Sequence, residues 1–269
     1  MTFVWDHYMN LSSIFGILLA LVVLFAAIIM STDNYLFFFN LHAIVIVVGG
    51  TAAAAFICFP MKQVLGLFRV FVNRLLGANR RNYEQLIEDI VILAKAFPEG
   101  YQRFNDATSR VRDPFLKDAA EVLEWGEAEI DEEQIRELLE NRRATHYSRY
   151  MKQANTFRTI SKFPPAFGLL GTTLGMIALM QSLGPGSEGT IGKSMAIALV
   201  ATLYGITVAN LILIPISENL VEQTEEDHIS RTIAVEGIMM IYKKLPVQFI
   251  EENSKSFLLP AERPQKAAS

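Results

Sequence analysis

The chain has 269 residues, of which 51% are hydrophobic, and it carries a formal net charge of −4 at pH 7. Its length would suit one or two soluble domains, but the apolar residues are too clustered for a soluble protein. Four blocks contain no Asp, Glu, Lys or Arg, and each reaches about 20 residues, the length that a membrane-spanning helix needs. These blocks are residues 11–32, 40–60, 164–183 and 194–217. We therefore expect an all-α integral membrane protein with four transmembrane helices and a helical cytoplasmic domain.

The first block is expected to be a retained span rather than a cleaved signal peptide. The segment before it contains Asp6 and no Lys or Arg. The apolar run is also longer than the ~7–15 residues of a signal peptide's apolar region.

Positive charges lie close to both ends of the segment between the second and third blocks. Cytoplasmic loops of membrane proteins carry an excess of Lys and Arg, and the short connections at 33–39 and 184–192 contain neither. We therefore expect the long segment and both termini to be cytoplasmic. The basic residues are Lys62, Arg69, Arg74, Arg80 and Arg81 at one end and Arg149, Lys152, Arg158 and Lys162 at the other.

This topology predicts five parts along the chain. They are a cytoplasmic N-terminus (1–10), two spans (11–60), a cytoplasmic helical domain (61–162), two further spans (163–216) and cytoplasmic C-terminal helices with a tail (217–269).

Helical periodicity predicts the elements of the cytoplasmic part. A basic amphipathic helix continues from the membrane over 61–77. Pro98 ends the next helix, and Asp113 caps the helix after it. A long helix then begins at a capping Asp131 and continues toward the third span. A long helix follows the fourth span, and Pro246 separates it from a short one. The sequence shows no strand-like alternation of apolar and polar residues.

The sequence carries no signature of an enzyme. It has no Gly-rich phosphate-binding loop, no HExxH or CxxC motif and no nucleophile beside a base. The four histidines, His7, His42, His146 and His228, lack the spacing of metal ligands. We expect neither catalysis nor nucleic-acid binding, and no bound cofactor.

The four blocks also lack the acidic residue that proteins carrying protons or cations through lipid normally hold there. Either the chain moves no ions, or a partner subunit supplies the acid.

Small residues recur at helical spacing in the third and fourth blocks. Such ridges let helices approach closely in lipid, and each carries one threonine, Thr172 or Thr202, near its centre. One interpretation is packing alone, with each hydroxyl bonded to its own i−4 carbonyl. The other is a route on which a cation exchanges water for hydroxyl and carbonyl oxygens, with a further carbonyl freed by Pro165. The expected interface residues are Gly168, Gly171 and Gly175 on the third block and Ala198, Gly205 and Ala209 on the fourth.

Three segments make the chain similar to a known family. They are PPAFGLLGTTLGMIALM at 164–180, MAIALVATLYGITVANLILIPI at 195–216 and VVGGT at 47–51. The chain resembles the A subunit of the bacterial flagellar stator, the MotA/PomA family of the MotA/TolQ/ExbB superfamily. The resemblance implies an inner-membrane protein whose homopentameric ring surrounds two MotB/PomB-type B subunits, which bring the missing intramembrane Asp. Ion flow through this complex is then expected to generate torque on a FliG-type rotor protein.

The resemblance also assigns residues. Pro165, Thr172 and Thr202 match the family's ion-path positions, and Ala201 stands where sodium-driven relatives usually have a second Thr. Asn40 stands where many members have Asp at the outer end of the second span. Both Na⁺ and H⁺ stay open as the transported ion, with Na⁺ preferred because Thr172 retains a cation-ligating oxygen.

The charged pair with which the family contacts the rotor is altered in this chain. Its Arg position reads Pro98, and Arg103 with Glu99 or Asp106 is the expected substitute one turn away. The alternative interpretation of this cluster is an ordinary solvated helix face.

Two other functions are compatible with the pattern. The first is an ExbB/TolQ-like ion-driven subunit that energises outer-membrane processes. Those relatives usually have three spans and a long outward N-terminal segment, whereas four spans are expected here. The second is a purely structural membrane scaffold whose ridges only pack.

Overall fold

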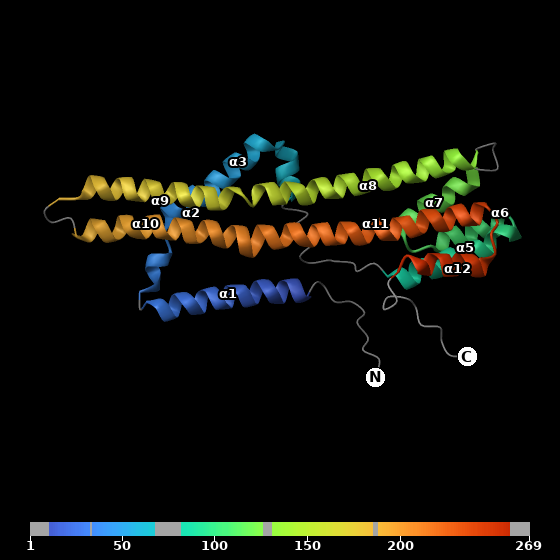
Figure 1. The fold of residues 1–269 in the computed structure, drawn as a ribbon, viewed down its shortest axis with the longest axis horizontal. Helices are drawn as coiled ribbons and strands as arrows, with labels where there is room; N and C mark the ends of the chain where they lie inside the picture. The colour runs from blue at the N-terminus through green and yellow to red at the C-terminus, as the bar shows by residue number, and fades with distance from the viewer. Residues whose placement is uncertain (1–10, 33, 68–81, 126–130, 185–187, 259–269) are drawn as a thin grey trace. The chain divides into compact units, whose positions relative to one another are not determined.

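The computed structural model describes residues 11–32, 34–67, 82–125, 131–184 and 188–258, and it contains no strand among them. The all-α prediction is therefore confirmed for these residues. The chain divides into two compact units (Figure 1). The first comes from Met1–Asn79 and Lys152–Leu220, and the second from Arg80–Met151 and Val221–Ser269.

The helices of the first unit correspond to the four uncharged blocks. The second and fourth blocks each contain a π-helical segment, in which the turn is wider than in an α-helix. The elements are α1 (Leu11–Ser31), η1 (Tyr35–Phe38), α2 (Leu41–Ile44), the π segment η2 (Val45–Gly49), α3 (Gly50–Cys58), α9 (Phe163–Ser182), α10 (Glu188–Thr207) and the π segment η4 (Val208–Leu213), which continues into α11 (Ile214–Tyr242).

Three of the described helices are long and apolar enough to cross a membrane. They lie within Tyr35–Cys58, Glu132–Gln181 and Ser194–Tyr242. The apolar helix Leu18–Ser31 falls below that length, although α1 as a whole has 21 residues and no charge. Length and composition thus support the second, third and fourth of the expected spans. The first expected span, α1, stays a prediction.

Helices α9 and α10 lie side by side (Figure 1) and make contact through glycines. A methyl group added at Gly168 would stand 2.9 Å from the carbonyl oxygen of Ala201, and one added at Gly175 would stand 2.7 Å from Cβ of Ala198. At Gly205 it would overlap the carbonyl oxygen of Pro164. Because glycine has no Cβ, the two backbones approach more closely here than larger side chains permit.

The second span covers one side of the α9–α10 pair. Ala43 and Val47 from this span form a buried cluster with Val200 and Ala201 of α10. Opposite α9, Gly50 leaves room for the ring of Phe167. The other side of the pair is open in the single chain, and its apolar side chains are exposed: Leu169 and Leu199 at 64% and Ile206 at 50%.

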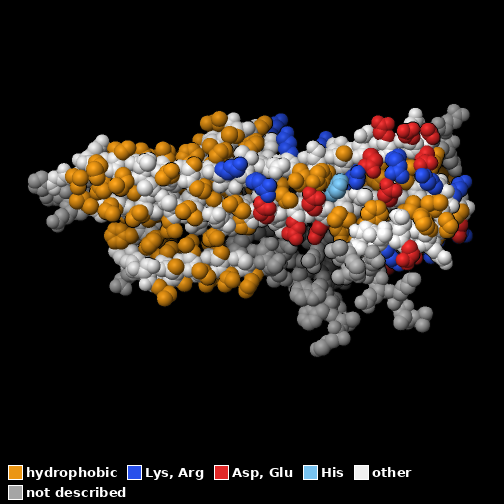
Figure 2. All heavy atoms as spheres, in the orientation of Figure 1, with side chains coloured by type: hydrophobic (Ala, Val, Ile, Leu, Met, Phe, Trp, Pro, Cys, Tyr) orange, Lys and Arg blue, Asp and Glu red, His pale blue; other side chains and the backbone are white. Residues whose placement is uncertain are grey.

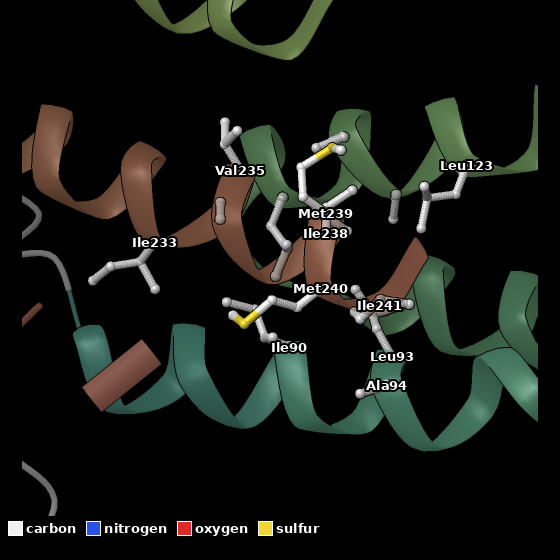
Figure 3. Packing of buried hydrophobic residues seen from close by; sticks show 14 of the residues in the cluster. Ile90, Leu93, Ala94, Leu123, Ile233, Val235, Ile238, Met239, Met240 and Ile241 are labelled. Atoms are coloured by element: carbon white, nitrogen blue, oxygen red, sulfur yellow. The ribbon is translucent and has the colours of Figure 1, made fainter. Parts of the chain in front are cut away.

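The second unit is a helical domain with its own core, shown in Figure 3. Fully buried side chains such as Ile90, Leu93, Leu116, Ile135 and Ile238 meet at its centre. The elements are α5 (Tyr83–Ala96), η3 (Phe97–Glu99), α6 (Tyr101–Arg110), α7 (Pro114–Trp125), the part of α8 (Glu132–Ile160) up to Met151, the part of α11 from Val221, and α12 (Val247–Ser256).

Local signals in the sequence explain where several of these helices begin and end. The Asp113 carboxylate accepts a hydrogen bond from the Leu116 N–H at 2.8 Å, which confirms the predicted cap of α7. Helix α5 ends at Ala96, just before Pro98, and α8 begins directly after Asp131, as predicted. The part of the predicted amphipathic helix beyond residue 67 lies outside the described residues.

The two units carry different surfaces. On the face drawn in Figure 2, hydrophobic side chains are spread over the helices of the first unit, and most Asp, Glu, Lys and Arg side chains lie over the second. Large apolar side chains of α1 and α9 are exposed, including Phe15 at 66% and Met180 at 57%. An apolar patch of this extent marks contact with lipid or with other protein chains.

We predict that Gly205→Ala separates α9 from α10, because the new methyl group overlaps the backbone of Pro164. Overpacking of this kind costs about 1–3 kcal/mol. The thermal stability of the detergent-purified protein measures the loss. Gly192→Ala is the matched control on the same helix, because nothing lies within 4 Å of that position. Equal melting temperatures for the two variants would contradict the glycine contact.

Candidate functional site

The hydroxyl groups of Thr172 and Thr202 meet between α9 and α10. Their Oγ1 atoms are hydrogen-bonded to each other, and both residues are partly buried. Each threonine stands next to the glycine contact, so the close approach of the backbones brings the two side chains within reach. The structure therefore joins two positions that are 30 residues apart in the sequence.

Two backbone carbonyl oxygens complete this group. Thr172 Oγ1 lies 3.0 Å from the oxygen of Ala198 and 3.2 Å from that of Gly168, and Thr202 Oγ1 lies 3.4 Å from the oxygen of Gly168. We call Thr172 Oγ1, Thr202 Oγ1 and these two carbonyl oxygens the oxygen cluster. Each carbonyl oxygen accepts a helical N–H and keeps a second lone pair, so the four oxygens retain unused acceptor capacity. Such a set is suited to a cation or to water.

The packing interpretation of the threonines explains only one of them. Thr172 does reach its own i−4 carbonyl, that of Gly168, as that interpretation expects. The hydroxyl of Thr202 reaches across the helix contact instead, to Thr172 and to the same Gly168 carbonyl. Thr173, the neighbour of Thr172, is exposed and donates to the Leu170 carbonyl of its own helix at 2.7 Å. Adjacent threonines thus have different surroundings.

Ala201 faces away from the oxygen cluster. It is fully buried and packs with Ala43 and Val47 of the second span. A Cβ built at Gly171 would stand 2.5 Å from Cβ of Ala201. The structure therefore places Ala201 one residue before Thr202 but on the covered side of the helix pair.

Pro165 lies in the first turn of α9, seven residues before Thr172, which is about 10 Å along the axis. Neither Pro164 nor Pro165 has an N–H, so the carbonyls of Ile160 and Ser161 receive no helical hydrogen bond from them. The structure does not bring Pro165 into contact with either threonine. The sequence pattern missed its neighbour Pro164, whose carbonyl touches Gly205.

A second residue that the sequence pattern missed is Tyr204. Its hydroxyl donates to the carbonyl oxygen of Phe38 and accepts a hydrogen bond from the Asn40 N–H at 3.5 Å. The Asn40 side chain in turn caps α2 by accepting from the Ala43 N–H at 3.2 Å. These contacts fix one end of the second span against α10, two residues from Thr202. The signal in the sequence was a phenol in an uncharged block.

The charged residues expected to contact a rotor lie in the second unit. Glu99 and Arg103 form an ion pair at 2.7 Å, and their side chains are 51% and 72% exposed. Asp106 is also exposed, and among the described residues it forms no ion pair with Arg103. Because both side chains are exposed, Glu99 and Arg103 are accessible to a partner. An exposed ion pair of this kind contributes little to stability.

Among the described residues, no group of three or more His, Cys, Asp or Glu side chains is placed to hold a metal ion. The oxygen cluster lies partly buried between α9 and α10.

Comparison with known proteins places the chain in a family. The model of the MotA/TolQ/ExbB proton channel family matches residues 107–232. Motility protein A of Borreliella burgdorferi is 32% identical over 194 residues, which cover 71% of this chain and 73% of that protein. The uncharacterized protein YtxD of Bacillus subtilis is 30% identical over 227 residues, covering 83% and 81%.

A solved structure agrees with these relatives. The flagellar MotAB stator complex from Bacillus subtilis contains a chain with a TM-score of 0.81 and 25% sequence identity, covering 95% of this chain and 99% of that one. The family resemblance seen in the spans is thereby confirmed: the chain belongs to the MotA/TolQ/ExbB proton channel family, in the branch of motility protein A.

Proposed function

We propose that the chain is the ion-conducting A subunit of a bacterial flagellar stator and converts an ion-motive force into torque on the rotor. The oxygen cluster carries this proposal. It provides four oxygen atoms between two uncharged spans, in a chain similar to motility protein A. The names of the relatives favour this function over the ExbB/TolQ-like alternative.

The chain acts with a B-type partner and with further copies of itself. The structure with which it shares 25% identity is that of a MotAB stator complex. The open side of the α9–α10 pair, next to the oxygen cluster, offers room for a partner's single-span helix with an intramembrane Asp. We expect a ring of five copies around two such helices. The partner's carboxylate supplies the acid that all four spans lack.

The ion is passed between the partner's carboxylate and the oxygen cluster. A cation that loses part of its water on entry exchanges it for the hydroxyls of Thr172 and Thr202 and the carbonyls of Gly168 and Ala198. One unit charge that falls through 100 mV releases about 2.3 kcal/mol. This is several times the thermal energy and is sufficient to bias one rotational step.

The cluster favours Na⁺ as the transported ion. None of its four oxygens belongs to a carboxylate or imidazole that could store a proton, whereas all four can serve as ligands for a small cation. The family as a whole is described as one of proton channels, and Ala201 lacks the second hydroxyl of the sodium-driven type. The preference for Na⁺ over H⁺ therefore depends on Thr172.

We place the chain in the inner membrane with four spans, of which α1 is the first, and with both termini in the cytoplasm. The basic residues on both sides of the 61–162 segment support this orientation. In it the second unit is cytoplasmic, and the exposed Glu99–Arg103 pair with Asp106 faces the rotor.

The first test is complementation. We predict that this chain, produced together with its B-type partner in a bacterium without stators, restores swimming and co-purifies with that partner. The chain without a partner is expected to reach the membrane but to leave the cells immotile. Motility without any B-type protein would exclude the proposal that a partner supplies the intramembrane acid.

The second test removes one oxygen of the cluster at a time. We predict that Thr202→Val or Thr172→Val slows swimming about threefold to tenfold, as expected when one oxygen contact of about 1 kcal/mol is lost. The amount of complex in the membrane is expected to stay unchanged, which an immunoblot checks. Thr173→Val is the matched control, because that hydroxyl bonds only to its own helix. Normal speed in both cluster variants would exclude the cluster from the ion route.

The third test identifies the ion. We predict that swimming speed at fixed pH rises with external sodium and then saturates. A speed that ignores sodium and follows external pH would show that protons are transported.

A further inference from the structure

A cavity lies between α1 and α10, and its volume is about 420 Å³. Helix α1 forms one wall, α10 forms the opposite wall, and η1 closes one end. Helix α1 lies beside α10 (Figure 1) and contacts η1 and η4. The residues that line the cavity include Leu24 and Ile28 of α1, Phe38 of η1, and Leu203 and Thr207 of α10.

The cavity is suited to an apolar ligand rather than to water. Carbon atoms make up nearly all of its surface. Tyr204 also borders it, but the Tyr204 hydroxyl is already bonded to the Phe38 carbonyl. An ordered water needs two to four polar partners, and an engineered apolar cavity of ~150 Å³ stays dry and takes up benzene. The cavity beside α1 has nearly three times that volume.

The cavity opens onto the exposed apolar surface of α1. Phe25 and Ile29, which belong to its lining, are 50% and 67% exposed. The same apolar surface continues along α1 at Leu18 and Val22, which are 56% and 59% exposed. A ligand can therefore enter from the surroundings of α1. In the proposed membrane placement, these surroundings are the acyl chains of lipids.

The cavity is separate from the ion route. On α10, Leu203 and Thr207 lie about 40° and 80° around the axis from Leu199, which faces the open side of the α9–α10 pair. The lining of the cavity includes neither Thr172 nor Thr202. A ligand in the cavity thus leaves the oxygen cluster free for an ion.

We propose that this cavity binds one acyl chain of a membrane phospholipid. Lipid chains are as apolar as the cavity wall, so the hydrophobic effect gives no preference for the site. The preference comes from the concave wall, which offers the chain more dispersion contacts than neighbouring chains do. The connection at 33–39 contains no Lys or Arg, so an anionic head group gains no ion pair there. This inference goes beyond the stator function and rests on the proposed placement of α1 in the membrane.

The test labels the site in the complete complex with its B-type partner. The complex is reconstituted in phosphatidylcholine vesicles that contain a small fraction of a phosphatidylcholine with a diazirine in the middle of one acyl chain. After irradiation, mass spectrometry maps the adducts. Labelling is expected to be enriched at Leu24, Ile28, Leu203 and Thr207 relative to the exposed Leu18. A phosphatidylglycerol with the same labelled chain is expected to give the same pattern.

Tryptophan substitutions fill the cavity from either wall. Leu24→Trp is expected to lower labelling of Leu203 and Thr207 about fivefold or more, because the added ring occupies the space of the chain. Leu18→Trp is the matched control, since it makes the same exchange at an exposed position of α1 outside the lining. Leu203→Trp fills the cavity from α10 and is expected to protect Leu24. The amount of assembled complex is measured for each variant.

Four outcomes would overturn the inference. Equal labelling of Leu18 and the cavity residues would show ordinary contact with surrounding lipid only. Labelling that is present in the chain alone but disappears in the assembled complex would assign the cavity to a second copy of the chain. Undiminished labelling in both Leu24→Trp and Leu203→Trp would exclude the cavity as the binding site. Absence of label from the whole of α1 would remove that helix from the membrane. Swimming of complemented cells tests the stator function separately, so that function stands or fails independently of the labelling.

Discussion

The contact between α9 and α10 at Gly168 and Gly205 is the constraint on which the site depends. Only at this separation do a threonine of one helix and a threonine of the other share a hydrogen bond, and only then does the hydroxyl of Thr202 reach a carbonyl of α9. In lipid no hydrophobic effect drives helices together, so small residues and hydroxyls have to supply the attraction. The same residues therefore hold the pair together and form its polar centre.

The covered and open sides of this pair have separate roles. Ala201 and Gly171 face the second span, and Thr202 and Thr172 face the side that stays accessible. Successive residues of an α-helix differ by about 100° in direction, so a step of one residue separates the packing position 201 from the proposed ion contact at 202. A hydroxyl at position 201 would thus act from the covered side, at a distance from the ion itself.

Much of the fold could be predicted from the sequence because its signals are local. Uncharged runs of spanning length, the carboxylate cap at Asp113 and the stop at Pro98 each depend on a few neighbouring residues. The ridge of Gly168, Gly171 and Gly175 was likewise visible as a helical spacing. The two π segments were not predicted, because an extra residue in a turn leaves no fixed pattern. The contacts of Tyr204 with Phe38 and Asn40 also escaped prediction, since 164 or more residues separate the partners.

The hydrogen bonds of Tyr204 have a consequence for how the segment 34–40 can evolve. The phenol is hydrogen-bonded to a main-chain carbonyl at position 38 and a main-chain N–H at position 40, and both groups are retained when a side chain is exchanged for any residue except proline at position 40. Other substitutions in this segment therefore leave its hydrogen bonds to Tyr204 of α10 intact, as long as the backbone keeps its local conformation. The side chains of this segment can therefore change in evolution without moving Thr202 relative to Thr172.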